Sequence, residues 1–168
     1  ISDFVGVLDD GMPHFDFIMF DACFMMSVEV AYEVRNYTDY YIGSPTENPG
    51  PGAPYDKVVP YMFKPGAAAQ MAEAYFNHYK DNYKAGEGIS NANWTGGTSI
   101  CAVRTDALDD LADVTGQLLE RADNESMPSF NTVFDYDKRD MEEGHVGYYD
   151  FSQMMEMRLD ADAYVAWK

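Results

Sequence analysis

Apolar and polar residues alternate along the chain in blocks that predict strands and helices in turn. Residues 15–20 are nearly all apolar and follow a turn at Pro13, which is typical of a strand buried on both faces, as in a parallel sheet. Apolar side chains recur at helical spacing over residues 25–37, and residues 40–44 predict a second strand. Strand, helix and strand in this order predict a βαβ unit with parallel pairing and a right-handed crossover.

The same alternation continues through the rest of the chain. A loop rich in proline and glycine covers residues 44–55, and Thr105 or Asp106 is expected to begin a later helix as its N-cap. Alternating strands and helices predict an α/β layered structure. The other expected elements are helices at 1–10, 56–63, 67–84, 106–121 and 149–159, a loop at 86–97, a strand at 98–104 and a polar stretch of undecided structure at 128–147.

The chain is strongly acidic, with 11 Lys and Arg against 29 Asp and Glu and a net charge of −18 over 168 residues. Nucleic acid and anionic membrane surfaces are therefore not expected as partners, because both bind clustered Lys and Arg. A basic ligand or substrate would be attracted by this charge, although acidity also serves solubility alone. No apolar run approaches the ~18 residues of a membrane-spanning helix, so we expect no membrane span.

A catalytic hypothesis begins with Cys23, which ends the first predicted strand and starts the helix that follows. Open α/β sheets place their ligand sites at this end of the strands. The N-terminus of a helix favours an anion, so we expect it to favour the thiolate, which is the nucleophile of cysteine catalysis. The alternative is an inert buried cysteine, since a free cysteine usually belongs to the core.

Asp21 strengthens the catalytic hypothesis, because a carboxylate at the end of a buried strand is costly unless it has a partner. Residues two apart on an extended backbone point to the same side, so Asp21 and Cys23 are expected to face one pocket. A carboxylate beside the nucleophile would select an Arg or Lys side chain. The alternative is that Asp21 caps the helix at Phe24 or Met25.

The segment FDACFMMSVEVAYEV, followed by TDYYIGSPTENPGPGAPYD, resembles the clostripain-like cysteine peptidases, which share a clan with caspases, gingipains and legumains. The resemblance spans residues 17–56. It implies a caspase-like α/β fold, with a mostly parallel sheet flanked by helices as an αβα sandwich. Residues 1–168 are then expected to form a single peptidase domain as a fragment lacking the N-terminal strands, that is, a C-terminal portion or a heavy-chain-like fragment.

The resemblance also implies a function. Cys23 would be the nucleophile of a Cys–His dyad, and Asp21 the floor of a pocket for a basic P1 residue. Ser44 and Tyr55, at the two ends of the Pro/Gly-rich loop, would bind substrate along the cleft. The implied protein is a cysteine endopeptidase that cleaves after Arg or Lys. It is bacterial, and it is secreted, periplasmic or attached to the cell surface. It requires no cofactor, although calcium stimulates some members of the family.

The histidines depart from the family pattern, in which a His-Gly motif lies upstream of the Asp-Ala-Cys motif. His14 precedes the predicted strand and should lie at its opposite end, because a strand rises ~3.3 Å per residue. His78 falls within a predicted helix and is expected to pack there, which leaves His145 in a Gly-flanked loop as the local alternative. We expect the dyad histidine outside this chain, on a companion chain if the protein is cleaved. A catalytically inactive member that binds basic peptides or a partner protein is the alternative function.

Three further features have structural explanations. Cys101 is expected to pack in the core as a small apolar residue. Asp56 is expected to cap the following helix, with a contribution to the specificity pocket as the alternative. No metal site is predicted, because the acidic run lacks EF-hand spacing and favours a solvated charge cluster. That run comprises Asp135, Asp137, Asp140, Glu142 and Glu143.

Overall fold

The computed structural model of the protein describes residues 1–82, 98–122, 130–137 and 146–168. The chain forms two compact units, Ile1–Asp106 and Ala107–Lys168. The expected loop at 86–97 and four candidate residues, His145, Asp140, Glu142 and Glu143, lie outside the described residues. A single peptidase domain over residues 1–168 stays a prediction.

The first unit contains a three-stranded sheet, which is ordered β1 (Ile18–Met19), β2 (Tyr40–Gly43) and β3 (Cys101–Arg104). Strands β1 and β2 are parallel, with Ile18 opposite Tyr41, and helix α2 (Val28–Val34) connects them. The predicted βαβ unit is therefore confirmed. Strand β3 runs antiparallel to β2, so the described sheet is mixed, within the α/β class that the sequence predicted.

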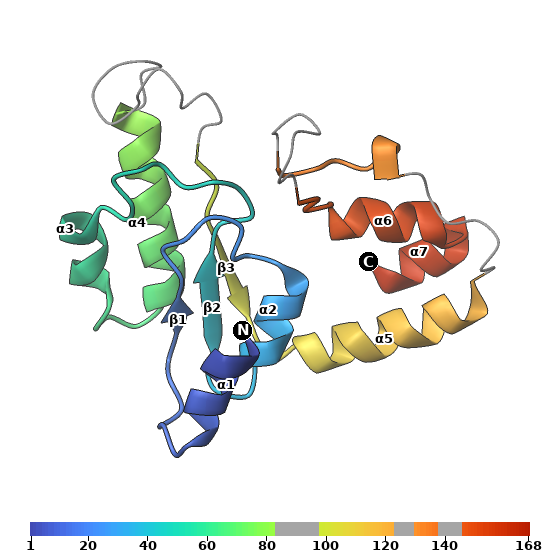
Figure 1. The fold of residues 1–168 in the computed structure, drawn as a ribbon, viewed down its shortest axis with the longest axis horizontal. Helices are drawn as coiled ribbons and strands as arrows, with labels where there is room; N and C mark the ends of the chain where they lie inside the picture. The colour runs from blue at the N-terminus through green and yellow to red at the C-terminus, as the bar shows by residue number, and fades with distance from the viewer. Residues whose placement is uncertain (83–97, 123–129, 138–145) are drawn as a thin grey trace. The chain divides into compact units, whose positions relative to one another are not determined.

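Helices cover both faces of this sheet (Figure 1). Helices α3 (Tyr55–Val58) and α4 (Ala67–Asn82), with the short 3-10 helix η1 (Val59–Tyr61), lie along one face, and α1 (Ser2–Asp9) lies with α2 on the other. The predicted helix at 56–63 forms α3 and η1 in succession. Pro60 lies in η1, where its missing N–H prevents an α-helical hydrogen bond.

The core of the first unit lies between the sheet and helix α4. Ile42 of β2 packs there with Met71, Tyr75 and Tyr79, which recur at helical spacing on one stripe of α4. Each large side chain that is fully buried contributes about 1.5–3 kcal/mol of stability. On the opposite face, the ring of Phe20 meets that of Phe4 edge-on, with centroids 5.3 Å apart. Strand β2, which pairs with both β1 and β3, is the central strand of the described sheet.

Strand β1 is shorter than expected. The sequence predicted a continuous strand over residues 15–20, whereas the structure has an isolated bridge from Phe15 to Thr38 and then the two residues of β1. Ile18 and Met19 are both half-buried, so burial on both faces is wrong for the described residues. The cause is position, since β1 lies at the edge of the described sheet.

The second unit is helical, with α5 (Leu108–Arg121), a 3-10 turn η2 (Phe130–Thr132), α6 (Phe151–Arg158) and α7 (Ala161–Trp167). Trp167 joins them, because its ring contacts Phe151 and its indole N–H donates to Thr115 at 2.9 Å. The sequence predicted α6 but not α7. Both begin at aspartate N-caps, whose carboxylates accept the backbone N–H three residues later.

The expected cap of α5 is wrong. Ala107 precedes the helix and provides no side-chain hydrogen bond. The two residues expected to cap it have other partners, since the Thr105 hydroxyl donates to the Thr38 carbonyl and Asp106 forms an ion pair with Arg104. Because Thr105 and Asp106 bond to these other partners, neither caps the helix, which begins at Leu108.

Candidate active site

Cys23 lies in a tight turn that follows β1 directly. The next residue, Phe24, has φ of 59°, a left-handed conformation that is uncommon for a bulky side chain and is found at functional sites. The turn is held against the Pro/Gly-rich loop, because the N–H of Phe24 donates to Thr46 at 3.0 Å and that of Met26 donates to Ser44 at 2.9 Å. Two backbone hydrogen bonds therefore stabilise a strained segment at the candidate nucleophile.

The expected position of Cys23 at a helix N-terminus is wrong. Helix α2 begins at Val28, with Ser27 as the N-cap whose hydroxyl accepts the N–H of Val30. The residues between Cys23 and Ser27 satisfy their backbone groups on the neighbouring loop instead of entering the helix. The argument from the helix dipole therefore does not apply to Cys23, because the effect falls off within the first turn.

The thiol of Cys23 is exposed and free, so the alternative of an inert buried cysteine is excluded. Its Sγ accepts the backbone N–H of Asn48 at 3.2 Å. This N–H is the hydrogen-bond donor that the structure places at the sulfur, where the sequence predicted a helix N-terminus. The donor comes from the loop between β2 and α3, so the loop takes part directly in the site.

Asp21 is held by the same loop. Its Oδ2 accepts the backbone N–H of Ala53 at 2.8 Å and the hydroxyl of Tyr55 at 3.0 Å. Asp21 is therefore not the cap of the following helix, which was the alternative explanation. The backbone between Asp21 and Cys23 forms a turn, so the expected extended conformation is wrong. Both side chains nevertheless contact the loop, Asp21 at Ala53 and Cys23 at Asn48.

Gly52 allows the loop to approach the carboxylate this closely. Its φ is 73°, and a Cβ at this position would stand 2.7 Å from Oδ2 of Asp21. Glycine meets both requirements, because it adopts positive φ without strain and has no side chain. The glycine in the expected substrate loop is therefore a condition for the geometry of Asp21.

Three tyrosines surround the carboxylate of Asp21. The hydrogen bond to Asp21 raises the pKa of Tyr55, and burial raises the pKa of Tyr75 and Tyr79, with the negative charge of Asp21 adding to both. The hydroxyl of Tyr79 donates to the Gly52 carbonyl at 2.5 Å. All three phenols stay neutral at physiological pH, so none of them adds a negative charge beside Asp21.

The site retains buried polar atoms without partners. Among the described residues, Oδ1 of Asp21, both amide atoms of Asn48 and the hydroxyl of Tyr75 are buried and have no hydrogen-bond partner. Buried polar groups are nearly always paired, and exceptions concentrate where a ligand, water or ion belongs. Sequence analysis missed both Asn48 and Tyr75. Neither belongs to the Asp-Ala-Cys motif, and a tyrosine on an apolar helical stripe indicates only core packing.

The two other expected substrate-binding residues occupy opposite environments. Ser44 is fully buried, and its hydroxyl donates to the carbonyl of Thr46 at 2.9 Å and accepts the N–H of Thr46 at 3.1 Å. Ser44 thus shapes the start of the loop. Tyr55 is 54% exposed and lies beside Asp21. Substrate binding by either residue stays a prediction.

The described histidines do not pair with Cys23. His14 bonds through Nε2 to Asp39 at 2.9 Å, and Asp39 precedes β2, so His14 lies at the end of the parallel strands opposite Cys23, as predicted. His78 packs its ring edge-on against Tyr79, with centroids 5.1 Å apart, which agrees with the expected packing role. His145 lies outside the described residues.

The remaining candidates have structural environments. Asp56 does not cap α3, because Pro54 holds that position, and its hydrogen bond to Lys57 at 2.8 Å lowers the pKa of Asp56. Cys101 is half-buried in β3, and burial raises the pKa of its thiol. Packing as a small apolar residue is therefore favoured for Cys101. The expected capping role of Asp56 is wrong, and its contribution to the specificity pocket stays a prediction.

Of the acidic run, the structure describes Asp135 and Asp137, and it corrects the expectation of a solvated cluster for Asp137. Asp137 is 2% exposed and accepts the N–H of Val146 at 3.3 Å. Asp135 accepts the N–H groups of Asp137 and Tyr148. Both carboxylates therefore bind backbone N–H groups of the described residues. Within the part of the chain that the structure describes, no group of three or more His, Cys, Asp or Glu could hold a metal ion.

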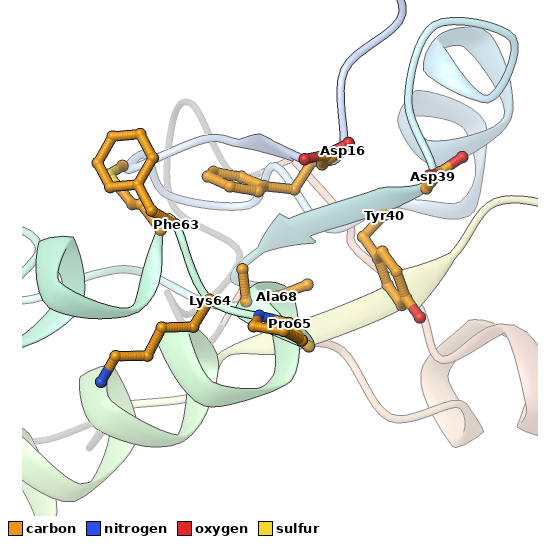
Figure 2. Close-up of a pocket in the computed structure, with 11 residues that line it drawn as sticks. Asp16, Asp39, Tyr40, Phe63, Lys64, Pro65 and Ala68 are labelled. Carbon is orange, nitrogen blue, oxygen red and sulfur yellow. The ribbon is translucent and has the colours of Figure 1, made fainter.

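A hollow of about 520 Å³ lies away from Cys23 (Figure 2). Asp16 and Asp39 line it at the beginnings of the parallel strands, and Phe63, Lys64 and Pro65 line it from the segment before α4. Cys23 follows the opposite end of β1, so this hollow is not the cleft expected at the nucleophile.

Among the described helices, none is long and apolar enough to cross a membrane.

These features accord with comparisons to known proteins. A family model described as the clostripain family of C11 peptidases matches residues 1–166. The chain therefore belongs to the clostripain family. A search of the curated proteins gave no significant match.

Solved structures of C11 proteases share the fold. A cysteine protease of B. fragilis is 37% identical, with a TM-score of 0.83, over 99% of this chain. A secreted C11 cysteine protease of Bacteroides thetaiotaomicron, solved with an irreversible peptide inhibitor, is 40% identical over 99% of this chain, with a TM-score of 0.79. An inactive zymogen C11 protease of Parabacteroides distasonis is 27% identical over 99%, with a TM-score of 0.79. The chain spans 67% of the B. fragilis chain and 44% of each of the other two.

Proposed function

We propose that this chain carries the nucleophile and the specificity pocket of a cysteine endopeptidase that cleaves after Arg or Lys. The observation that carries the proposal is the exposed thiol of Cys23, which accepts the Asn48 N–H on the loop that also holds Asp21. A C11 cysteine protease 40% identical to the chain was solved with an irreversible peptide inhibitor, which supports a peptide as substrate.

The reaction is acyl transfer. An imidazole takes the proton of Cys23, and the thiolate attacks the carbonyl carbon of the basic residue. The backbone N–H of Cys23 is a donor for the oxyanion that forms. The amine then leaves with a proton from the imidazole, and water hydrolyses the thioester, which releases the acid and restores the thiol.

The dyad histidine is proposed to come from outside this chain. The described histidines, His14 and His78, have other contacts, and the chain spans 67% or less of the solved C11 proteases named above. Another segment of a longer protein, or a companion chain that stays associated after cleavage, would supply the imidazole. Secretion by a bacterium belongs to the same proposal, as does activity without a required cofactor; calcium stimulates some members of the family.

Selection of a basic P1 residue is assigned to Asp21. Its Oδ2 is held by two neutral donors, while Oδ1 is buried without a partner. An ammonium or guanidinium group gives a carboxylate a stronger hydrogen bond than a neutral donor does. A cationic side chain is therefore the partner that best satisfies this carboxylate.

An inactive protein that binds basic peptides is the second candidate. The observation in its favour is that no described imidazole is bonded to Cys23. Such a protein would retain the charge selectivity of Asp21 without cutting the peptide. Cleavage of a bound peptide distinguishes the active endopeptidase from the inactive binding protein.

The test is cleavage of peptides that differ only at P1, by the complete protein that contains this chain. We expect cuts after Arg and Lys, and loss of all cuts in Cys23→Ala. Asp21→Asn preserves shape but removes the charge, at a cost of about 3 kcal/mol, or on the order of a hundredfold in kcat/KM for basic P1. Binding without turnover would favour the second candidate, and equal cleavage after basic and neutral residues would contradict the role of Asp21.

A further inference from the structure

The unpaired polar atoms gather at the candidate site. Of the five buried side-chain atoms without a partner among the described residues, four belong to Asp21, Asn48 and Tyr75. Asn48 donates its backbone N–H to the thiol of Cys23, and Asp21 is held by the same loop. Tyr75 comes from a different element, helix α4, and neither the sequence pattern nor the proposed mechanism gives its hydroxyl a role.

Packing fixes the position of Tyr75 next to Asp21. Tyr75 is fully buried, and its ring lies 5.5 Å from that of Tyr79, one turn later on α4. The hydroxyl of Tyr79 bonds to Gly52, the residue whose backbone stands against the carboxylate of Asp21. Helix α4 therefore presents two tyrosines toward the loop that carries the pocket, on the face of the sheet that α4 covers (Figure 1).

The electrostatic environment agrees with this placement. Burial raises the pKa of Tyr75, and the negative charges of Asp21 and Cys23 add to the rise. The hydroxyl is thus neutral and lies within electrostatic reach of both functional groups. A side-chain hydrogen-bonding contribution from Asp21 also raises this pKa, so the hydroxyl lies close to the carboxylate. Neither the hydroxyl nor Oδ1 of Asp21 makes a hydrogen bond of ordinary geometry.

A purely structural role does not explain the hydroxyl. Phenylalanine would fill the same space in the core, without the cost of burying an unpaired polar group. An unpaired hydroxyl beside an unpaired carboxylate oxygen is instead suited to a ligand with several N–H donors. Tyr55 is half-exposed and makes one hydrogen bond to Asp21. A charged ligand group that enters beside Tyr55 would replace this neutral donor with a cationic one.

We propose that Tyr75 is a specificity-determining residue whose hydroxyl oxygen, together with Oδ1 of Asp21, accepts N–H groups of the basic P1 side chain. The inference rests on the proposed function, and it adds a residue from helix α4 to a pocket otherwise built from β1 and the loop before α3. Asp21 supplies the charge, and Tyr75 supplies a second acceptor that a P1 side chain without N–H groups leaves unused.

The experiment compares Tyr75→Phe with the unsubstituted complete protein, on peptides with arginine, lysine, citrulline or norleucine at P1. A hydrogen bond to a charged group implies a loss of about tenfold or more in kcat/KM for arginine and lysine, mainly through KM. Norleucine peptides should be cleaved as before, because norleucine has no side-chain N–H group. Citrulline keeps N–H groups without the charge and should lose less than arginine. Because the hydroxyl has no partner in the free protein, the Tm of Tyr75→Phe should be unchanged or higher.

Tyr37→Phe is the control, since it removes a tyrosine hydroxyl at another place, before the start of β2, where the hydroxyl bonds to Asp9. It should leave the arginine-to-norleucine ratio unchanged. An unchanged ratio in Tyr75→Phe, or an equal loss on all four peptides, would overturn the inference and leave the proposed function standing. Failure of the unsubstituted protein to prefer basic P1 would overturn both.

Discussion

At the scale of single residues, the environment of Cys23 is made by backbone groups. Its sulfur accepts one N–H from Asn48, and the following residue, Phe24, is held in a left-handed conformation. Strain of this kind persists where surrounding contacts over-determine the backbone. Here those contacts come from the loop after β2, so the geometry of the nucleophile depends on the segment proposed to bind substrate.

Some residues of the site could be predicted from the sequence, and others could not. Asp21 and Cys23 could be chosen from the sequence because their spacing at a strand end is a local pattern, and the structure places both beside the Pro/Gly-rich loop. The extended backbone expected between them is wrong, and their roles stay predictions. Asn48 and Tyr75 were missed, since their importance arises from contacts with residues far away in the chain. A buried hydroxyl without a partner has no signature in a list of amino acids.

His14 provides a prediction that depends on a single hydrogen bond. The bond to Asp39 raises the pKa of His14 above its usual value of 6.5. Its stabilising contribution is therefore fully present below the unfolded-state pKa and is lost as pH rises through the folded-state pKa. An NMR titration of the imidazole should give a midpoint above 6.5, and Asp39→Asn should lower it. A midpoint that is the same in both proteins would contradict the pairing.

At the scale of elements, the site is assembled where a short strand meets a long loop. The sequence predicted both elements, and it predicted the helices around them to within a few residues. The errors concern ends of elements. Helix α2 begins at Val28 and not beside Cys23, and α5 begins after Ala107 because Thr105 and Asp106 bond elsewhere. Capping is a competition among several acceptors, and the sequence does not reveal which one wins.

Two glycines of the loop give a matched pair of variants. Gly52→Ala places a Cβ 2.7 Å from Asp21 at a φ of 73°, which costs about 1–2 kcal/mol in backbone strain alone and displaces the carboxylate. Gly50→Ala meets nothing within 4 Å and should behave like the unsubstituted protein. The Tm of thermal unfolding and the rate of cleavage after arginine should both be lower in Gly52→Ala. Equal behaviour of the two variants would show that the close approach of Gly52 is not required.

At the scale of the whole molecule, the chain has a mixed sheet with helices on both faces, and family membership follows from a match over residues 1–166. The sequence predicted the fold class through one segment, residues 17–56, whose motif is specific. It did not predict the antiparallel direction of β3 or helix α7. Strand direction depends on pairing across the sheet, where Gly43 meets Cys101, and such distant pairing leaves little trace in local periodicity.

The most direct test of the account is covalent labelling of the complete protein with peptidyl chloromethyl ketones bearing Lys, Arg or norleucine at P1, followed by peptide mass spectrometry. The account predicts one adduct, on the exposed thiol of Cys23, formed faster with Lys or Arg. Cys101, half-buried and with a raised pKa, should remain unmodified. An adduct on Cys101 in place of Cys23, or a rate that is indifferent to the P1 side chain, would contradict it.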